Sequence, residues 1–161
     1  MNNLKKKHNI TTEINIDKKP KYGNTYDIYI YLKKNNKIIG RITAHDSPLY
    51  KDEVKEKYTD SLGVLAVNPE FRGLNLGYAL ICLLKNVYKN NNFNAKYLIL
   101  SPSDKDLEKF IKHGGKFENL HKYRKKNKFK LLQFYEKLGF KLIDTQVMKV
   151  NIDNINCINL I

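Results

Sequence analysis

Residues 62–84, LGVLAVNPEFRGLNLGYALICLL, decide the fold that we predict for this chain. The stretch combines an apolar segment typical of a strand, a turn at Asn68 and Pro69, a loop with glycines, and a segment with helical apolar spacing. Glycines in such a loop leave backbone N–H groups accessible, and the helix after them directs its positive dipole end to the same place. Arg72 adds a planar cation suited to phosphate oxygens. These features predict a site for a pyrophosphate-bearing cofactor at residues 72–78.

Three segments ahead of this stretch have the composition of strands. Residues 10–17 alternate weakly between isoleucine and polar residues, and residues 26–34 (YDIYIYLKK) are rich in residues that favour strands. The Asn35–Asn36 pair predicts a hairpin turn, and residues 37–45 (KIIGRITAH) supply the partner strand. A charged segment follows, in which we expect a short helix at residues 52–58.

Residues 61–67 form the fourth expected strand, and the helix follows after Arg72. Its apolar residues recur at helical spacing, which predicts one buried stripe made of Leu76, Leu80, Leu83, Leu84 and Val87. Residues 95–100 (AKYLIL) have the composition of a further, buried strand.

The remaining third of the chain is read as two helices and a hairpin. A short helix is expected at residues 103–113, inside a basic insertion at about 102–128. Residues 129–138 predict a second helix, and residues 140–152 predict a hairpin. The tail, residues 154–161, is a candidate edge strand that offers a way for two copies to pair as a homodimer.

The predicted order is β, β, β, β, α, β, α, β, β, which indicates an α+β fold with helices covering a sheet. A length of 161 residues corresponds to a single domain, residues 1–161.

Composition narrows the possible partners. The formal net charge is +14, from 30 Lys and Arg against 16 Asp and Glu, yet only Arg41, Arg72 and Arg124 are arginines. Abundant Lys, Asn and Ile are typical of an A/T-rich genome, microbial or viral, so we attribute most of the charge to solvated lysines. No nucleic-acid-binding motif accompanies it, and nucleic acid is not the partner that we expect.

Cysteine, histidine and hydropathy patterns give further expectations. Cys82 and Cys157 provide neither a disulfide framework nor metal-ligand spacing, and Cys82 is read as a small buried residue within a helix. His113 and His121 have no metal-ligand spacing either, so we expect no metal. No apolar run has membrane-spanning length, and we expect a protein of the reducing cytoplasm without a membrane partner.

Two motifs together resemble the GCN5-related N-acetyltransferases. The acetyl-CoA signature of that family is Gln/Arg-x-x-Gly-x-Gly/Ala, after a strand that ends in Val-x-Pro. Residues 65–69 (LAVNP) and 72–79 (RGLNLGYA) follow this pattern, except that Asn75 stands at the first signature glycine. Asparagine tolerates left-handed conformations, so we expect the loop to form. Residues 134–140 (FYEKLGF) are similar to the family's late helix.

The resemblance implies a fold and a set of site residues. The fold is a central mixed, mostly antiparallel sheet flanked by helices, with an acyl-CoA cleft where the central strands splay apart. The strand residues that would pair with the pantetheine arm are Leu65, Ala66 and Val67, and a backbone N–H near Val67 would face the developing oxyanion. The residues that would hold the pyrophosphate are Arg72, Gly73, Leu74, Asn75, Leu76, Gly77 and Tyr78. Tyr135 would protonate the leaving thiolate.

The same resemblance leaves the base and the acceptor open. A lysine-type amine is neutral only about one part in a thousand near pH 7, so a base or a water relay is needed. Many family members place a carboxylate near the start of the strand before the signature, where Asp60 lies, although Ser61 occupies the nearer register. His45 is the rival candidate. The family also has two helices between its first two strands, and these helices shape the acceptor site. This chain has only residues 18–24 there, so the resemblance describes the acceptor side of the site least.

The function predicted from these residues is transfer of an acetyl group from acetyl-CoA to a primary amine by direct attack. The acceptor is a small molecule or a protein, and no metal takes part. The alternative is a basic module that binds nucleic acid or protein on the same fold without turnover.

Overall fold

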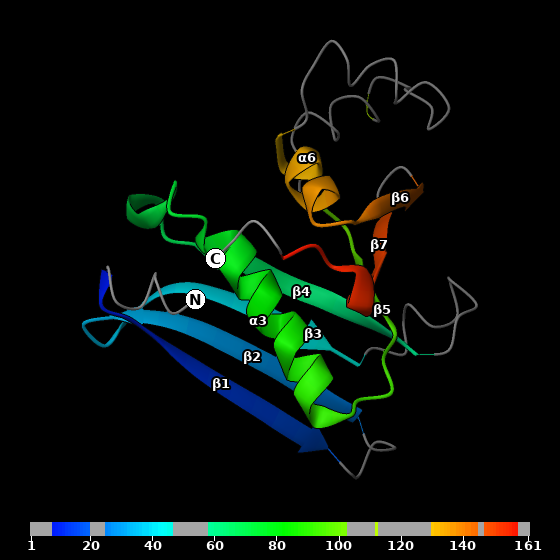
Figure 1. Cartoon of the computed structure of the whole chain (residues 1–161), viewed down its shortest axis with the longest axis horizontal. Coiled ribbons are helices and arrows are strands. Elements are labelled where there is room, and N and C mark those ends of the chain that lie inside the picture. The colour runs from blue at the N-terminus through cyan, green and yellow to red at the C-terminus, as the bar shows by residue number, and fades with distance from the viewer. Residues whose placement is uncertain are drawn as a thin grey trace.

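The computed structural model describes residues 8–19, 25–46, 58–102, 112, 130–144 and 147–157 (Figure 1). Its strands and helices, in chain order, are β1 (Ile10–Lys19), β2 (Thr25–Lys34), β3 (Lys37–His45), β4 (Thr59–Val67), the 3-10 turn η2 (Pro69–Phe71), α3 (Leu76–Asn91), β5 (Tyr97–Leu100), α6 (Lys130–Lys137), β6 (Lys141–Asp144), β7 (Val147–Asn151) and η3 (Ile152–Asn154).

The strands form one sheet in the order β1-β2-β3-β4-β5-β7-β6. β4 and β5 run parallel and every other neighbouring pair is antiparallel. Figure 1 shows α3 laid across β2–β4, and α6 beside the β6–β7 hairpin. The α+β class and the mixed, mostly antiparallel sheet are therefore confirmed.

Alternation along β2 separates a buried face of the sheet from a more exposed one. Tyr26, Ile28, Ile30 and Leu32 are buried, whereas the residues between them are partly exposed. Full burial of each aliphatic side chain contributes about 1.5–3 kcal/mol. The buried face is the one that α3 covers, and we call the opposite face of β1–β3 the polar face.

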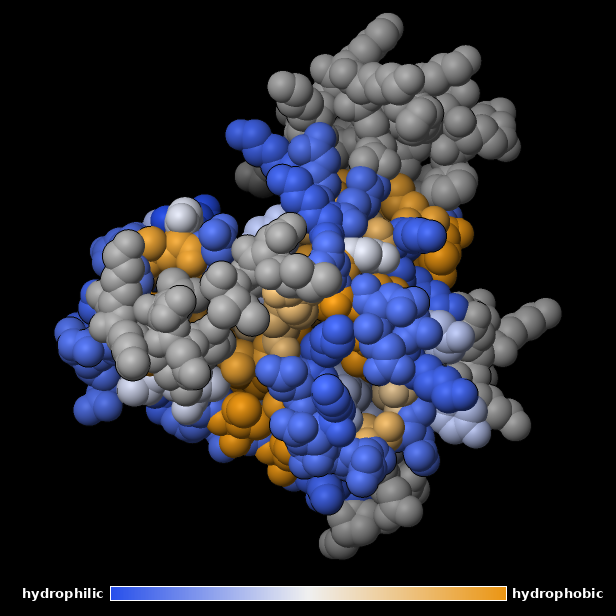
Figure 2. Space-filling view, in the orientation of Figure 1, coloured by the Kyte–Doolittle hydropathy of each residue, from blue (hydrophilic) through white to orange (hydrophobic). Residues whose placement is uncertain are grey.

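Helix α3 closes the buried face with the apolar stripe that its sequence predicts. Leu76, Leu80, Leu84 and Val87 are buried, and Leu83 is partly buried against the same core. The helix ends at Asn92, whose left-handed backbone (φ 51°) stops further helical pairing. Figure 2 shows the surface of the same side of the molecule as Figure 1. Most of this surface is hydrophilic, and hydrophobic residues are exposed in places between the hydrophilic ones.

Strand β4 carries a bulge in its middle. Ile42 of β3 pairs with Leu65, but Ala44 pairs with Leu62, so Gly63 and Val64 lie opposite Thr43 alone. The extra residue is fastened by a hydrogen bond of 2.9 Å from the Val64 N–H to Thr43 Oγ1. A bulge at this position bends β4 and strengthens its twist.

Beyond the bulge, β4 and β5 separate. Their parallel pairing runs only from Thr59–Tyr97 to Ser61–Ile99. β4 continues to Val67 while β5 ends at Leu100, so residues 62–67 pair with no strand on that side among the described residues. Their backbone groups on that edge remain open to another extended chain.

A buried polar cluster lies at the start of β4. The hydroxyls of Tyr26 and Tyr88 donate hydrogen bonds of 2.5 and 2.6 Å to Oδ2 of Asp60, whose side chain is almost fully buried. Burial, together with the negative carboxylate, raises the pKa of both tyrosines. Phe93 stacks on Tyr26 at a centroid distance of 4.1 Å, which completes the apolar wall of the cluster.

The expectation that the two cysteines provide no disulfide framework is wrong. Cys82 in α3 and Cys157 after η3 form a disulfide, with their Cα atoms 5.9 Å apart and 75 positions between them in the sequence. Lys85, one turn further along α3, donates a 2.9 Å hydrogen bond to the Ile155 carbonyl. The end of the described chain is thereby tied to α3 by a covalent and a polar contact.

The later elements mostly follow the prediction. α6 and the β6–β7 hairpin are confirmed, but Ile152–Asn154 form a 3-10 turn and residues 155–157 form no strand. The expected helix at 103–113 and the basic insertion lie outside the described residues, apart from Pro102 and Lys112. The helix expected at 52–58 also lies outside them, apart from Tyr58.

We predict that Tyr88→Phe lowers the free energy of unfolding by about 1–3 kcal/mol, because the buried Asp60 carboxylate loses a donor that water does not replace. Tyr31→Phe is the matched control, since Tyr31 is half-buried on the polar face. Urea denaturation of both variants measures the effect. Equal midpoints for the two would contradict a stabilising role of the cluster.

Candidate active site

The end of β4, the loop after it and the start of α3 enclose a cavity of about 200 Å³. Its lining consists of Val67, Phe71, Arg72, Gly73, Asn75, Leu76, Gly77, Tyr78 and Phe134. The loop is anchored at its beginning, because the Asn68 N–H donates a 2.8 Å hydrogen bond to the Ile39 carbonyl of β3. Asn68 Oδ1 in turn accepts a 3.1 Å hydrogen bond from the Glu70 N–H, which fixes η2.

Two left-handed residues shape the loop. Gly73 has φ 87°, and Asn75 has φ 58° and ψ 28°. Asparagine is one of the few residues besides glycine that adopts this conformation at modest cost. The expectation that the loop tolerates Asn75 at a glycine position is therefore confirmed.

The first turn of α3 is suited to an anion. It contains no acidic residue, and the Asn75 side chain makes no capping hydrogen bond to it. The first N–H groups of a helix have no partner within the helix, and they lie at the positive end of its dipole. The electrostatics of the cavity floor thus favour a phosphate group.

Gly77 lets α6 approach α3 at the side of the cavity. A Cβ at this position would lie 3.2 Å from Cζ of Phe134, closer than ordinary van der Waals contact. The Phe134 ring also packs on Tyr78, with centroids 4.5 Å apart. The absence of a side chain at Gly77 therefore permits the aromatic wall that Tyr78 and Phe134 build.

The structure brings together most of the predicted cofactor residues. Seven of them line the cavity: Val67, Arg72, Gly73, Asn75, Leu76, Gly77 and Tyr78. Leu65 and Leu74 instead pack against the core as partly buried residues. Ala66 faces a second hollow of about 390 Å³, which Ile38 and Arg41 of β3 also line.

Two cavity residues were missed in the sequence, Phe71 and Phe134. Phe71 directly precedes Arg72, and its ring lies 5.6 Å from Nζ of Lys34. Phe134 belongs to the FYEKLGF motif, in which the family resemblance assigns a role only to the neighbouring Tyr135. Both are large apolar residues next to a predicted site residue, and this position could have indicated them in the sequence. Only the packing of α6 on α3, however, shows that Phe134 reaches the loop.

Tyr135 lies in the core next to the cavity rather than in its lining. Its side chain is buried, and its ring contacts Phe134 and Phe140 at centroid distances of 5.1 and 5.5 Å. Burial raises the pKa of Tyr135 to about 12. The hydroxyl therefore stays protonated at physiological pH.

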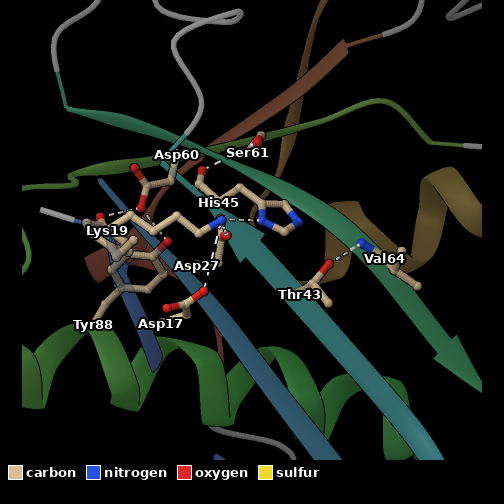
Figure 3. Close-up of polar contacts among 10 residues, drawn as sticks. Asp17, Lys19, Asp27, Thr43, His45, Asp60, Ser61, Val64 and Tyr88 are labelled. Atoms are coloured by element: carbon tan, nitrogen blue, oxygen red, sulfur yellow. Dashed lines mark hydrogen bonds and ion pairs between the residues drawn. The ribbon is translucent and has the colours of Figure 1, made fainter. Parts of the chain in front are cut away.

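The two base candidates lie on opposite faces of the sheet (Figure 3). Asp60 is only 2% exposed. Its side chain lies on the buried face, where it accepts hydrogen bonds from Tyr26 of β2 and Tyr88 of α3. His45 pairs with Ser61, the next residue of β4, so it lies on the polar face. Its Nδ1 is 2.8 Å from Oδ1 of Asp27.

Within the described residues, no helix is long and apolar enough to cross a membrane. The same residues contain no group of three or more His, Cys, Asp or Glu side chains arranged to hold a metal ion.

The sequence profile of the Acetyltransferase (GNAT) family matches residues 7–115. This range is more than half of the 161 residues, and it contains the open edge of β4, the loop and α3. The chain therefore belongs to the GNAT acetyltransferase family. A comparison with curated proteins gives no match.

Solved structures share the fold at low sequence identity. The PaiA N-acetyltransferase of Thermoplasma acidophilum, in complex with coenzyme A, is 15% identical with a TM-score of 0.51, and the match covers 78% of this chain and 60% of that one. The loading GNATL domain of CurA from Lyngbya majuscula is 13% identical with a TM-score of 0.54, over 78% and 76%. A GNAT-family acetyltransferase of Staphylococcus aureus is 16% identical with a TM-score of 0.50, over 78% and 68%.

We predict that Asn75→Gly keeps or raises the stability of the protein, whereas Asn75→Ala lowers it by about 1 kcal/mol relative to the glycine variant. Both changes remove the side chain, but only alanine resists the left-handed backbone. Urea denaturation of the pair measures the difference. Equal stabilities would show that residue 75 leaves this conformation at no cost.

Proposed function

We propose that the protein transfers an acetyl group from acetyl-CoA to a primary amine by direct attack. The observation that carries the proposal is the continuity of the open edge of β4 with the cavity at the start of α3. If an extended thioester arm paired with β4, the diphosphate at its far end would lie in that cavity. Because the family is shared, acetyl-CoA is the donor that this arrangement fits best.

The phosphate end of the donor would be held mainly by backbone. The N–H groups at the start of α3 are hydrogen-bond donors whatever side chains the residues carry. Apolar residues such as Leu74 and Leu76 are therefore compatible with a phosphate site. Arg72 contributes the cationic side chain of the cavity lining. A guanidinium forms paired hydrogen bonds with phosphate oxygens, so it adds both charge and orientation.

The reacting end would lie along β4 toward the bulge. Main-chain pairing with residues 65–67 would align the pantetheine arm, and a backbone N–H near Val67 would polarise the thioester carbonyl. The amine nitrogen attacks the carbonyl carbon, the C–N bond forms, and the C–S bond breaks with its electron pair passing to sulfur.

Tyr135 is the proposed acid for the departing thiolate. A hydroxyl with a pKa of about 12 remains protonated, so it donates a hydrogen bond to sulfur throughout the neutral range. The same shift makes it a weaker acid than an exposed tyrosine, so hydrogen bonding to the sulfur is expected to contribute more than full proton transfer.

The CoA complex of the Thermoplasma enzyme supports the donor, because that protein shares the fold. This chain spans 60% of that protein's length, so the likeness does not extend to its acceptor. The amine acceptor proposed here is a small molecule or a protein.

We predict that acetyl-CoA raises the melting temperature of the protein and that Arg72→Ala reduces this shift. Loss of charged hydrogen bonds to phosphate corresponds to about 10- to 100-fold weaker binding. Lys89→Ala is the matched control, because it removes one positive charge from the opposite end of α3.

A shift that is the same in both variants would mean that Arg72 does not hold the donor. No shift in the unaltered protein at millimolar acetyl-CoA would contradict the proposed function. Salt-sensitive binding to RNA in its place would favour the basic binding module.

We predict that Tyr135→Phe lowers the rate of acetyl transfer about 10-fold or more while the melting shift with acetyl-CoA is retained. The substitution removes only the hydroxyl, and the ring contacts with Phe134 and Phe140 persist. The rate of CoA release with a panel of amines measures the effect. An unchanged rate would remove Tyr135 as the acid.

A further inference from the structure

His45 and Asp27 form a dyad on the polar face of the sheet, on neighbouring strands. The register of β2 with β3 places Asp27 directly opposite His45, and Nδ1 of His45 is 2.8 Å from Oδ1 of Asp27. The other carboxylate oxygen, Oδ2, accepts a 2.7 Å hydrogen bond from the Lys19 ammonium of β1 (Figure 3). The His45 side chain is 35% exposed.

These contacts fix which nitrogen of the ring is basic. Partial burial alone would raise the pKa of the Asp27 carboxyl, but the hydrogen bonds from Lys19 and His45 outweigh it and hold that pKa below the usual range. An ionised carboxylate only accepts hydrogen bonds, so Nδ1 of His45 must carry the proton. In the neutral ring Nε2 then holds the free lone pair.

Nε2 lies against the bulge of β4. A Cβ at Gly63 would be 2.7 Å from Nε2 of His45 and 2.6 Å from Oγ1 of Thr43. Gly63 is therefore a position where the missing side chain makes room for the imidazole. The bulge is also where β4 leaves β5, and an acyl arm along the open edge would reach it from the loop side.

We propose that His45 is the general base for the acceptor amine, and that Asp27 is its positioning residue. This inference rests on the proposed function. As the amine nitrogen attacks the thioester carbonyl carbon, Nε2 takes one proton from that nitrogen. The C–N bond forms, the C–S bond breaks, the electron pair goes to sulfur, and the imidazolium that results is stabilised by the Asp27 carboxylate.

The alternative carboxylate is poorly placed for this role. Asp60 points to the α3 face and is almost fully enclosed, whereas the dyad lies on the accessible polar face. Among the described residues, the other charged or titratable groups on the strands beside the ring include Asp17 and Lys19 of β1 and Tyr29 of β2. Tyr29 meets the ring edge-on at a centroid distance of 6.2 Å.

The test compares His45→Gln and Asp27→Asn with His8→Gln, which removes a histidine ahead of β1. Rates of CoA release are measured against pH with spermidine, glucosamine, kanamycin and a peptide with a free amino terminus. His45→Gln is expected to lower the rate about 100-fold or more at neutral pH and to abolish the fall in rate toward acid pH. Asp27→Asn is expected to lower kcat about 10-fold or more while the KM for the amine is retained. Imidazole added to His45→Ala is expected to restore part of the rate.

The melting shift with acetyl-CoA, measured on the same variants, separates the two proposals. A retained shift with an unchanged rate and pH profile in His45→Gln overturns the base assignment and leaves the proposed function standing. Absence of the shift in every variant and in the unaltered protein overturns the proposed function itself.

If acetyl-CoA binds but no amine of the panel reacts, bromoacetyl-CoA decides the assignment. Nε2 of a nearby His45 displaces bromide and forms a C–N bond, which peptide mass spectrometry locates. Labelling of His45 that CoA prevents supports the inference, and labelling elsewhere or none overturns it.

Discussion

The site depends on one constraint in the sheet, the early end of pairing between β4 and β5. Parallel pairing stops at Ser61 and Ile99, and the bulge at Gly63 turns β4 away at nearly the same point. Beyond that point, β4 has no partner on this side among the described residues, and its edge leads into the loop before α3. A fully paired β4 would have no backbone left to bind an extended ligand, and the loop would then be only a surface turn.

The rest of the chain holds this open strand in place. Asp60, hydrogen-bonded by Tyr26 and Tyr88, fastens the start of β4 to β2 and α3. The Asn68 N–H bond to β3 fastens its end. The disulfide between Cys82 and Cys157 ties the last described segment to the same helix. Contacts that fix both ends of an unpaired strand lower the ordering cost when an extended ligand binds to it.

Local patterns in the sequence were enough to predict the strands, α3 and the loop. Strand alternation, helical spacing and the ability of asparagine to adopt a left-handed backbone at position 75 each depend on only a few neighbouring residues. Contacts between distant residues were not predictable in this way. Whether Asp60 or Ser61 faces α3 depends on the register with β3, and the pairing of Asp27 with His45 depends on the register with β2. The disulfide joins residues 75 positions apart, and the contact of Phe134 with Gly77 requires the packing of α6 on α3. The charge of +14 gave no guidance to the site, since Arg72 is the only arginine or lysine that lines the cavity among the described residues.

The proposed donor site combines the open edge of β4 with the start of α3. Backbone amide chemical shifts of the 15N-labelled protein, recorded during titration with CoA, report directly on both parts. The largest changes are expected on residues 65–67 and 72–78. Unchanged amides there, with changes confined to the basic residues 122–130, would contradict it.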